Sequence, residues 1–200
     1  MDDPVAGQIL EDFSRSLAAV RALTEHPYPT LVRDAASMLE RTIRTGGKVL
    51  FCGNGGSAAE SLHFAAELVG RQNFDRRGVA GIALTADTAA LSAIGNDYEF
   101  EYVFARQVEA IGRSGDALVA ISTSGRSANV IRALHAARES GIATIAMTGS
   151  EPHDMAYADL VIAAPALETA TIQELHLIIG HAMFATVERE LFDNDAASGC

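Results

Sequence analysis

Residues 48–69 read KVLFCGNGGSAAESLHFAAELV, and this stretch decides the fold class of the 200-residue chain. It begins with the apolar run KVLFC, continues through a turn that holds three glycines, and ends in apolar residues at helical spacing. A continuous apolar run before a glycine-rich turn and a helix is typical of a strand buried on both faces of a parallel sheet. The stretch therefore predicts a strand, a turn and a helix, with the turn at the edge of the sheet where such folds bind ligands.

The same alternation continues towards the C-terminus. Four further apolar runs are expected to be strands, and they are residues 79–84, 116–122, 143–148 and 159–164. Helical patterns are found at 87–93, 128–140 and 171–192. This alternation predicts an α/β fold with three layers, in which a parallel sheet of about five strands lies between helices.

The N-terminal residues show a helical pattern that the His-Pro-Tyr-Pro stretch at 26–29 divides in two. We expect residues 1–45 to form helices that pack on the same domain, residues 46–192 to form the α/β domain, and residues 193–200 to form a disordered tail. A chain of 200 residues has room for one such core and little room for a second.

The composition narrows the function classes. The formal net charge is −11, and a field of that sign repels phosphate backbones, so nucleic-acid binding is not expected and an anionic substrate needs a local site. No stretch is apolar enough to span a bilayer, and the acidic N-terminus does not resemble a signal peptide. Cys52 and Cys200 are the only cysteines, which argues against a disulfide framework. These features predict a cytoplasmic protein without a membrane partner.

A run of hydroxyl residues follows the third predicted strand, in the sequence Ser122-Thr123-Ser124-Gly125-Arg126-Ser127. The start of the next helix offers unpaired N–H groups and a partial positive charge, so the run is suited to hold a phosphate. The alternative is a long helix cap, since serine and threonine are common at such positions. One cap needs a single hydroxyl, and the surplus favours phosphate binding.

The turn after the first predicted strand, Gly53-Asn54-Gly55-Gly56-Ser57, allows close backbone approach to a ligand, but it also fits a plain turn capped by Ser57. It lacks the G-x-G-x-x-G spacing of dinucleotide-binding folds, which disfavours a nucleotide-dependent oxidoreductase. Asn96 and Asp97 are expected in a loop after the second crossover helix, where they bind sugar hydroxyls or form a turn.

Two predicted helices carry residues that can bind a metal ion. His63 and Glu67 lie four residues apart on one helix face, and such a pair is either two zinc ligands or a surface hydrogen-bonded pair. Gln173 and His181, in the last helix, lie about 80° apart in projection and can serve one site. Taken alone, His181 and the nearby His176 also fit packed or solvated histidines.

Four motifs in register resemble those of one family. They are GNGGSAAESLHFAAEL, AIGNDYEFE, ISTSGRSANVI and IQELHLIIGH, and the resemblance runs from about Lys48 to the end of the last helix. The family is the sedoheptulose 7-phosphate isomerases, a branch of the sugar isomerase (SIS) domain proteins. The resemblance implies a three-layer α/β/α SIS domain that follows N-terminal helices.

The resemblance also implies roles for the matching residues. The substrate would be bound by Asn54, Gly55, Gly56, Ser57, Glu67, Asn96, Asp97, Ser122, Thr123, Ser124, Ser127 and Gln173. One zinc ion per subunit would be held by His63, Glu67, Gln173 and His181. Glu67 and His181 would form the catalytic acid/base pair.

By the same resemblance, the chain would be an aldose–ketose isomerase that converts sedoheptulose 7-phosphate to D-glycero-D-manno-heptopyranose 7-phosphate through a metal-assisted enediol or enediolate, and it would form a homotetramer. Two alternatives stay open: a non-catalytic SIS-domain module that binds another protein, and an isomerase of another sugar phosphate. The complete set of metal-type residues favours catalysis.

Two positions depart from the family pattern. Leu62 stands where the family often has glutamine, and Thr171 stands where it often has arginine or lysine. The second departure removes a basic contact beside the expected site. Arg126, within the predicted phosphate loop, is a candidate to replace that contact.

Overall fold

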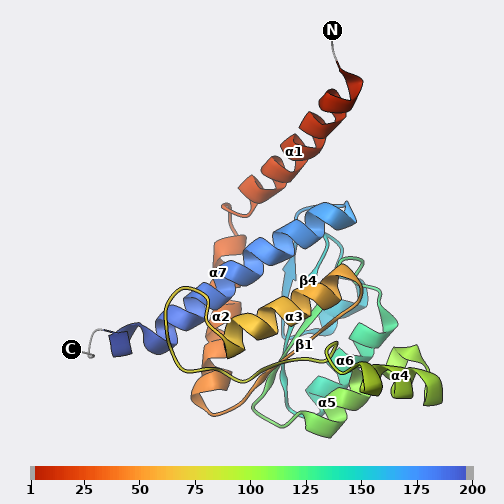
Figure 1. The fold of residues 1–200 in the computed structure, drawn as a ribbon, viewed down its shortest axis with the longest axis vertical. Coiled ribbons are helices and arrows are strands. Elements are labelled where there is room, and N and C mark those ends of the chain that lie inside the picture. The colour runs from red at the N-terminus through yellow and green to blue at the C-terminus, as the bar shows by residue number, and fades with distance from the viewer. Residues whose placement is uncertain (1–2, 197–200) are drawn as a thin grey trace.

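The computed structural model describes residues 3–196 and contains one sheet of five parallel strands between two layers of helices (Figure 1). The strand order is β2-β1-β3-β4-β5. The strands are β1 (Val49–Gly53), β2 (Gly81–Ala83), β3 (Ala117–Ser122), β4 (Ala143–Thr148) and β5 (Leu160–Ala163). The predicted three-layer α/β architecture with about five parallel strands is confirmed.

The part of the chain that the structure describes contains seven α-helices and two short 3₁₀ turns. The helices are α1 (Pro4–Ala22), α2 (Tyr28–Arg44), α3 (Gly56–Val69), α4 (Thr88–Asp97), α5 (Ala105–Ile111), α6 (Ala128–Glu139) and α7 (Thr169–Ala196). The 3₁₀ turns are η1 (Phe100–Tyr102) and η2 (His153–Tyr157). None of the helices in residues 3–196 combines the length and the hydropathy that are needed to span a bilayer.

The core lies on both faces of the sheet because alternate strand residues point to opposite sides. Phe51 of β1 packs into a cluster with residues of α2, α3 and α7, such as Phe64 and Phe184. Its neighbours Leu50 and Cys52 pack on the other face with residues of α5 and α6. Burial on both faces explains why the strands appear in the sequence as continuous apolar runs.

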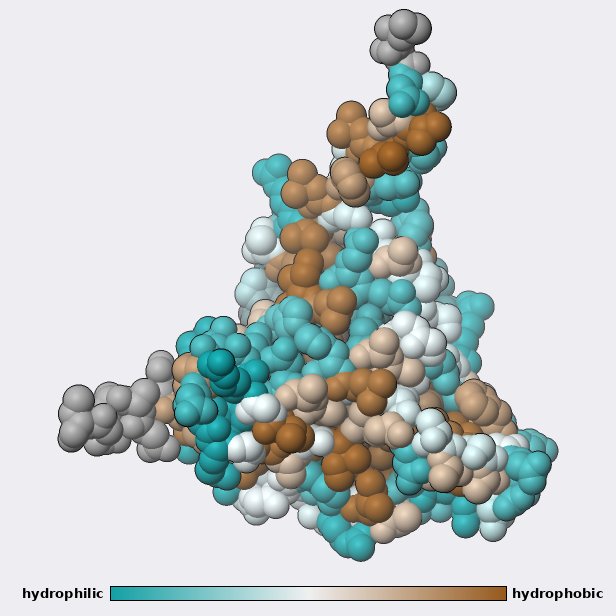
Figure 2. All heavy atoms as spheres, in the orientation of Figure 1, coloured by the Kyte–Doolittle hydropathy of each residue, from teal (hydrophilic) through white to brown (hydrophobic). Residues whose placement is uncertain are grey.

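The two N-terminal helices behave differently. Helix α2 packs against α7 and β5, and its residue Leu39 is fully buried. Helix α1 extends away from the sheet, and Ala19 is its only buried residue (Figure 1). Figure 2 shows apolar side chains along this helix, and the most exposed of them are Val5, Leu10, Phe13 and Leu17. Helix α1 therefore carries apolar surface that the single chain leaves uncovered.

The boundaries differ from the expected ones in three places. Helix α5 was not expected, because its seven residues are too short to show a clear period. Asn96 and Asp97 form the last turn of α4 instead of a loop, since the helix runs further than residue 93. Helix α7 continues to Ala196 and so includes part of the expected tail, whereas residues 197–200 lie outside the described part of the chain.

Candidate active site

The hydroxyl run after β3 forms a compact loop at the start of α6. Ser122 Oγ lies 2.9 Å from Ser127 Oγ and 3.4 Å from Ser124 Oγ. Ser127 is the N-cap residue of α6, yet its side chain makes no capping hydrogen bond. The hydroxyls are therefore not consumed in capping the helix. They converge beside its N-terminus, where they can donate to an anion.

The glycine-rich turn after β1 lies against this loop. Asn54 and Asn129 exchange two side-chain hydrogen bonds of 2.8 and 2.9 Å, which join the turn to the first residues of α6. The side-chain amide of Gln173 lies so close to Gly56 that a Cβ atom there would displace it, so glycine permits this position of the Gln173 amide. Turn and loop together line a hollow of about 300 Å³, whose walls are Asn54, Gly55, Gly56, Ser57, Ile121, Ser122, Thr123, Ser124, Ser127, Thr169 and Gln173.

Two helices bring the metal-type residues together. His63 Nε2 of α3 lies 2.7 Å from His181 Nε2 of α7 and 3.6 Å from Glu67 Oε1. One ligand atom from each of the three residues lies within 4.8 Å of the other two. Glu67 Oε2 is buried and has no hydrogen-bond partner. Two imidazole nitrogens and a carboxylate with an unsatisfied oxygen are a donor set that suits zinc.

The metal-type cluster adjoins the phosphate-type hollow. A second hollow of about 510 Å³ is lined by Gly56, Ala59, Glu60, His63, Gln173, Leu177 and His181. Gly56 and Gln173 line both hollows, so the two spaces meet at these residues. We describe the pair of hollows as one site with a hydroxyl end and a His/Glu end.

The floor of the His/Glu end contains a carboxyl group that was not expected. Glu60 is buried, and neither of its carboxyl oxygens has a hydrogen-bond partner. His176 Nδ1 lies 3.6 Å from Glu60 Oε2, and His176 Nε2 lies 3.0 Å from the Thr148 carbonyl oxygen. The available signal was helical spacing, because Glu60 lies three residues before His63 on the same face of α3.

A buried ion pair holds the two helices of the cluster in place. Arg76 and Glu188 are joined at 3.0 Å, and their side chains are 4% and 1% exposed. The Arg76 guanidinium also donates to the Glu67 carbonyl oxygen at the end of α3, and Gln72 Nε2 donates to the His181 carbonyl oxygen of α7. These bonds connect the segment after α3 to the backbone of both residues that are expected to perform catalysis.

Glu188 is charged in this network. Burial acts to raise the pKa of its carboxyl group, but hydrogen bonds from Gln72 and Asn73 and the charge of Arg76 outweigh burial and hold the pKa below its usual value. The two backbone N–H groups donate over 3.0 and 2.7 Å. A carboxylate that accepts several hydrogen bonds stays ionised, and its partners depend on that charge.

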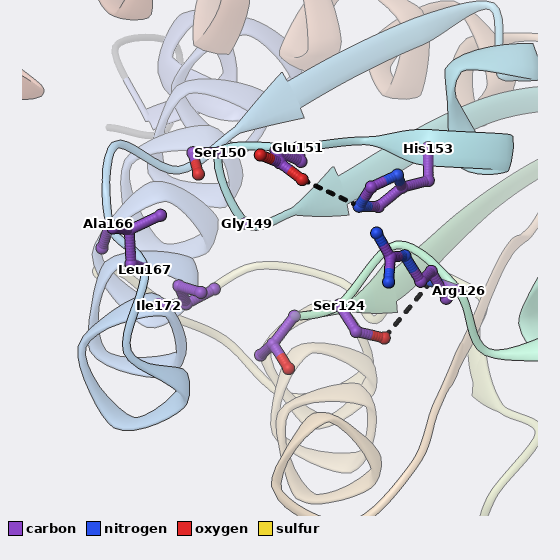
Figure 3. A pocket seen from close by; sticks show the side chains of 10 residues that line it. Ser124, Arg126, Gly149, Ser150, Glu151, His153, Ala166, Leu167 and Ile172 are labelled. Carbon is purple, nitrogen blue, oxygen red and sulfur yellow. Dashed lines mark hydrogen bonds and ion pairs between the residues drawn. The ribbon is translucent and has the colours of Figure 1, made fainter.

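Several expected residues do not line the two hollows. Glu67 lines neither, although one of its carboxylate oxygens lies within 4.8 Å of ring nitrogens of His63 and His181. Asn96 and Asp97 are exposed at the end of α4, and the Asn96 side chain donates to Asp97 Oδ1 over 2.8 Å. They do not line either hollow, so a substrate contact is not supported by their place in the single chain. Arg126 also lies outside, because it lines a separate hollow on the other side of Ser124 (Figure 3). The single chain therefore places the Arg126 side chain in a different hollow from the one beside which Thr171 replaces a basic residue.

Comparisons with known proteins place this chain in a family. The sequence profile of the SIS domain family matches residues 12–149, which is more than half of the chain. The phosphoheptose isomerase of Roseiflexus sp. (strain RS-1) is 47% identical over 186 residues, which cover 92% of this chain and 94% of the relative. The phosphoheptose isomerase of Rhodospirillum rubrum is 50% identical over 161 residues, which cover 80% of this chain and 86% of the relative.

A solved structure supports the same assignment. The phosphoheptose isomerase of Neisseria gonorrhoeae is 41% identical and superposes with a TM-score of 0.87, covering 92% of this chain and 98% of that protein. The strand order, the hydroxyl loop and the relatives therefore agree. The chain belongs to the SIS domain family and, within it, to the phosphoheptose isomerases, a group of sugar-phosphate isomerases.

Proposed function

We propose that the chain interconverts sedoheptulose 7-phosphate and D-glycero-D-manno-heptopyranose 7-phosphate. The observation that carries the proposal is the junction of the two hollows at Gly56 and Gln173. One hollow offers hydroxyls and a helix N-terminus, which suit a phosphate, and the other offers imidazole and carboxylate groups, which suit proton transfer. A sugar phosphate needs both ends at once.

The hydroxyl end would hold the phosphate group. Ser124 and Ser127 each lie within hydrogen-bonding distance of Ser122, and a phosphate oxygen can replace these contacts. Because the chain carries a net charge of −11, this local set of donors must overcome the repulsion of the whole molecule. Binding energy at this remote group would orient the reacting carbons at the other end of the site.

The His/Glu end would perform the isomerisation. Aldose–ketose exchange moves a proton between two neighbouring carbons through an enediol, so it needs a base at carbon and a second group that exchanges a proton with oxygen. Glu67 is the proposed base, since one of its oxygens is buried without a partner and is free to take a proton. His181 is the proposed partner, because it lines the His/Glu hollow and one of its ring nitrogens lies within 4.8 Å of a Glu67 carboxylate oxygen.

A zinc ion is the proposed cofactor, one per subunit. It would be held by His63, Glu67, Gln173 and His181. The structure gathers ligand atoms of His63, Glu67 and His181, and Gln173 lines the same hollow as the two histidines. When bound, zinc supplies a Lewis acid that polarises the carbonyl oxygen. Glu67 would then act both as a ligand and as the base.

A homotetramer in the cytoplasm is the proposed physiological form. The exposed apolar side chains of α1, among them Leu10 and Phe13, give the single chain a surface that a further copy of the chain can cover. Light scattering at micromolar concentration tests this assembly. A monomer at that concentration would contradict it.

The decisive experiment uses sedoheptulose 7-phosphate, with and without a chelator, and follows the products by NMR. We expect a heptopyranose 7-phosphate to form, activity to disappear with chelator, and activity to return when zinc is added. A pentose phosphate and a hexose phosphate are tested in parallel as comparison substrates. Turnover of one of these alone would assign a different isomerase, and no turnover of any sugar phosphate with zinc present would favour a binding module.

A further inference from the structure

The hollow on the far side of Ser124 has a preformed shape (Figure 3). It measures about 270 Å³ and lies between the β3–α6 loop and the segment that follows β4. Gly149 N donates to the Thr123 carbonyl oxygen over 3.1 Å, which joins the two walls. Gly125 has a φ of 64°, and a Cβ atom there would lie 2.6 Å from the Pro152 carbonyl oxygen. Glycine at this position therefore allows the β3–α6 loop to approach the backbone of Pro152.

The side chains of Arg126 and His153 point into this hollow (Figure 3). Arg126 extends its guanidinium towards His153, and within residues 3–196 that guanidinium has neither an ion-pair partner nor a hydrogen-bond acceptor. His153 Nε2 lies 3.2 Å from Glu151 Oε2, whose side chain is 72% exposed and can turn away into water. The Arg126 side chain is exposed, so its positive charge is accessible to an anion from solvent.

The backbone at His153 supports a ligand role. Its φ is 46°, a left-handed conformation that residues other than glycine rarely adopt. Such conformations are concentrated at functional sites, where the surrounding structure holds them. Here the conformation directs the imidazole into the same space as the guanidinium of Arg126 (Figure 3).

We propose that this hollow is a second anion site, which binds the phosphate group of a small phosphorylated metabolite. Arg126 would provide the charge and a planar pair of N–H donors, His153 a further donor, and the Ser124 hydroxyl a neutral contact. This site is separate from the hydroxyl end of the active site, because Arg126 and His153 do not line that hollow.

The two anion sites share a wall. Thr123 and Ser124 line both hollows, so a phosphate in the second site would lie close to the phosphate of the sugar substrate. Two like charges at short range repel each other. An occupant would therefore raise KM for the sugar phosphate and leave kcat unchanged, a regulatory effect that rests on the proposed function. Binding of the anion itself does not depend on that function.

Equilibrium dialysis of the full chain with radiolabelled inorganic phosphate tests the proposal. We expect two phosphates per wild-type chain, and one in the Ser122→Ala/Ser127→Ala variant, whose hydroxyl end is weakened. Arg126→Gln and His153→Gln should each weaken only the second site, by about tenfold or more, because each removes a hydrogen bond to a charged group. Arg126→Lys should recover part of the affinity.

Arg41→Gln is the charge-matched control. Arg41 lies beside Gly115 and Asp116, ahead of β3 and thus at the opposite edge of the sheet, and its loss should leave two phosphates bound. A wild-type chain that binds one phosphate, or an Arg126→Gln variant that still binds two with normal affinity, would overturn the proposal.

Kinetics separates the second site from a direct role in substrate binding. In the absence of added phosphate, Arg126→Gln should keep the wild-type KM for the sugar phosphate. A raised KM would assign Arg126 to the substrate and overturn the second site. A chain that binds two phosphates but isomerises nothing would discard the proposed function and leave the second site standing.

Discussion

The hydroxyl end and the His/Glu end of the site are built in different ways. At the hydroxyl end, the hydroxyls of Ser122, Ser124 and Ser127 meet within one loop of six consecutive residues, 122–127. The His/Glu end joins His63 to His181, which lie 118 residues apart on different helices. A local loop keeps its geometry when helices shift, whereas a cluster across two helices does not. The comparison therefore predicts that the two ends can be disabled separately.

Loss of the proposed base should have the largest effect. Glu67→Gln keeps the size of the side chain but removes its charge, so kcat should fall by about a hundredfold or more, the usual range for a general base. Inorganic phosphate should still bind, because the hydroxyl end is a separate loop. Zinc content must be measured in the same sample, since Glu67 is also a proposed ligand. Near-normal turnover would leave His181 as the only candidate base.

Loss of the partner histidine should have the next largest effect. His181→Gln removes an imidazole that faces His63 Nε2 at 2.7 Å, so both zinc affinity and turnover should fall. Even outer partners of metal ligands contribute about tenfold to a hundredfold in affinity, and a direct ligand should contribute at least as much. Titration with zinc under competition by a chelator measures the change. His135→Gln, on α6, is the matched control and should bind zinc normally.

A change at the hydroxyl end should be smaller and of a different kind. Ser124→Ala removes one donor to the phosphate, so KM should rise by about tenfold, the value of one hydrogen bond to a charged group, while kcat changes little. Steady-state kinetics with the sugar phosphate measures both constants. An unchanged KM would contradict the assignment of this loop, and a large fall in kcat would show that the two ends are not separable.

The support behind the His/Glu end should affect stability more than turnover. Because the pKa of Glu188 lies below its usual value of 4.5, its charge stabilises the fold above that pH, and this contribution is lost as the pH falls through the lowered pKa. Glu188→Gln leaves Arg76 buried without its counter-charge and should cost about 3 kcal/mol at pH 7.

Urea unfolding at pH 7 and at pH 3.5, a pH chosen to lie about one unit below that usual value, measures this contribution. The stability difference between Glu188→Gln and wild type should shrink at the lower pH. Glu190→Gln, an exposed change on the same helix, is the control and should be nearly neutral at both. A difference that stays constant with pH would show that packing, and not charge, accounts for the role of Glu188.

Much of the fold was accessible from the sequence because its signals are local. The run KVLFC became β1 since a strand buried on both faces must be apolar throughout. The short elements were harder to see. Helix α5 has seven residues and β2 has three, and at that length the apolar pattern does not distinguish an element from a loop.

Part of the site was accessible for the same reason, and part was not. The hydroxyl run lies on one loop, so its residues can be grouped from the sequence alone. Glu60 was missed because a carboxyl group on a helix is usually solvated, and only the packing of α7 over α3 buries it beside His176. Asn96 and Asp97 were grouped with the site by resemblance, yet the end of α4 holds them away from both hollows.

The sequence by itself determined the alternation of strands and helices, the hydroxyl loop after β3 and the candidate ligands on the helices. Each of these features depends on a pattern of residues that are close together in the sequence. Only the tertiary structure decided which of these candidates meet. The tertiary structure brings His63 next to His181 and joins the two hollows at Gly56 and Gln173. It also places the Arg126 side chain in a separate hollow. The physical reason is that packing between distant helices and loops sets these distances, and no local pattern records it.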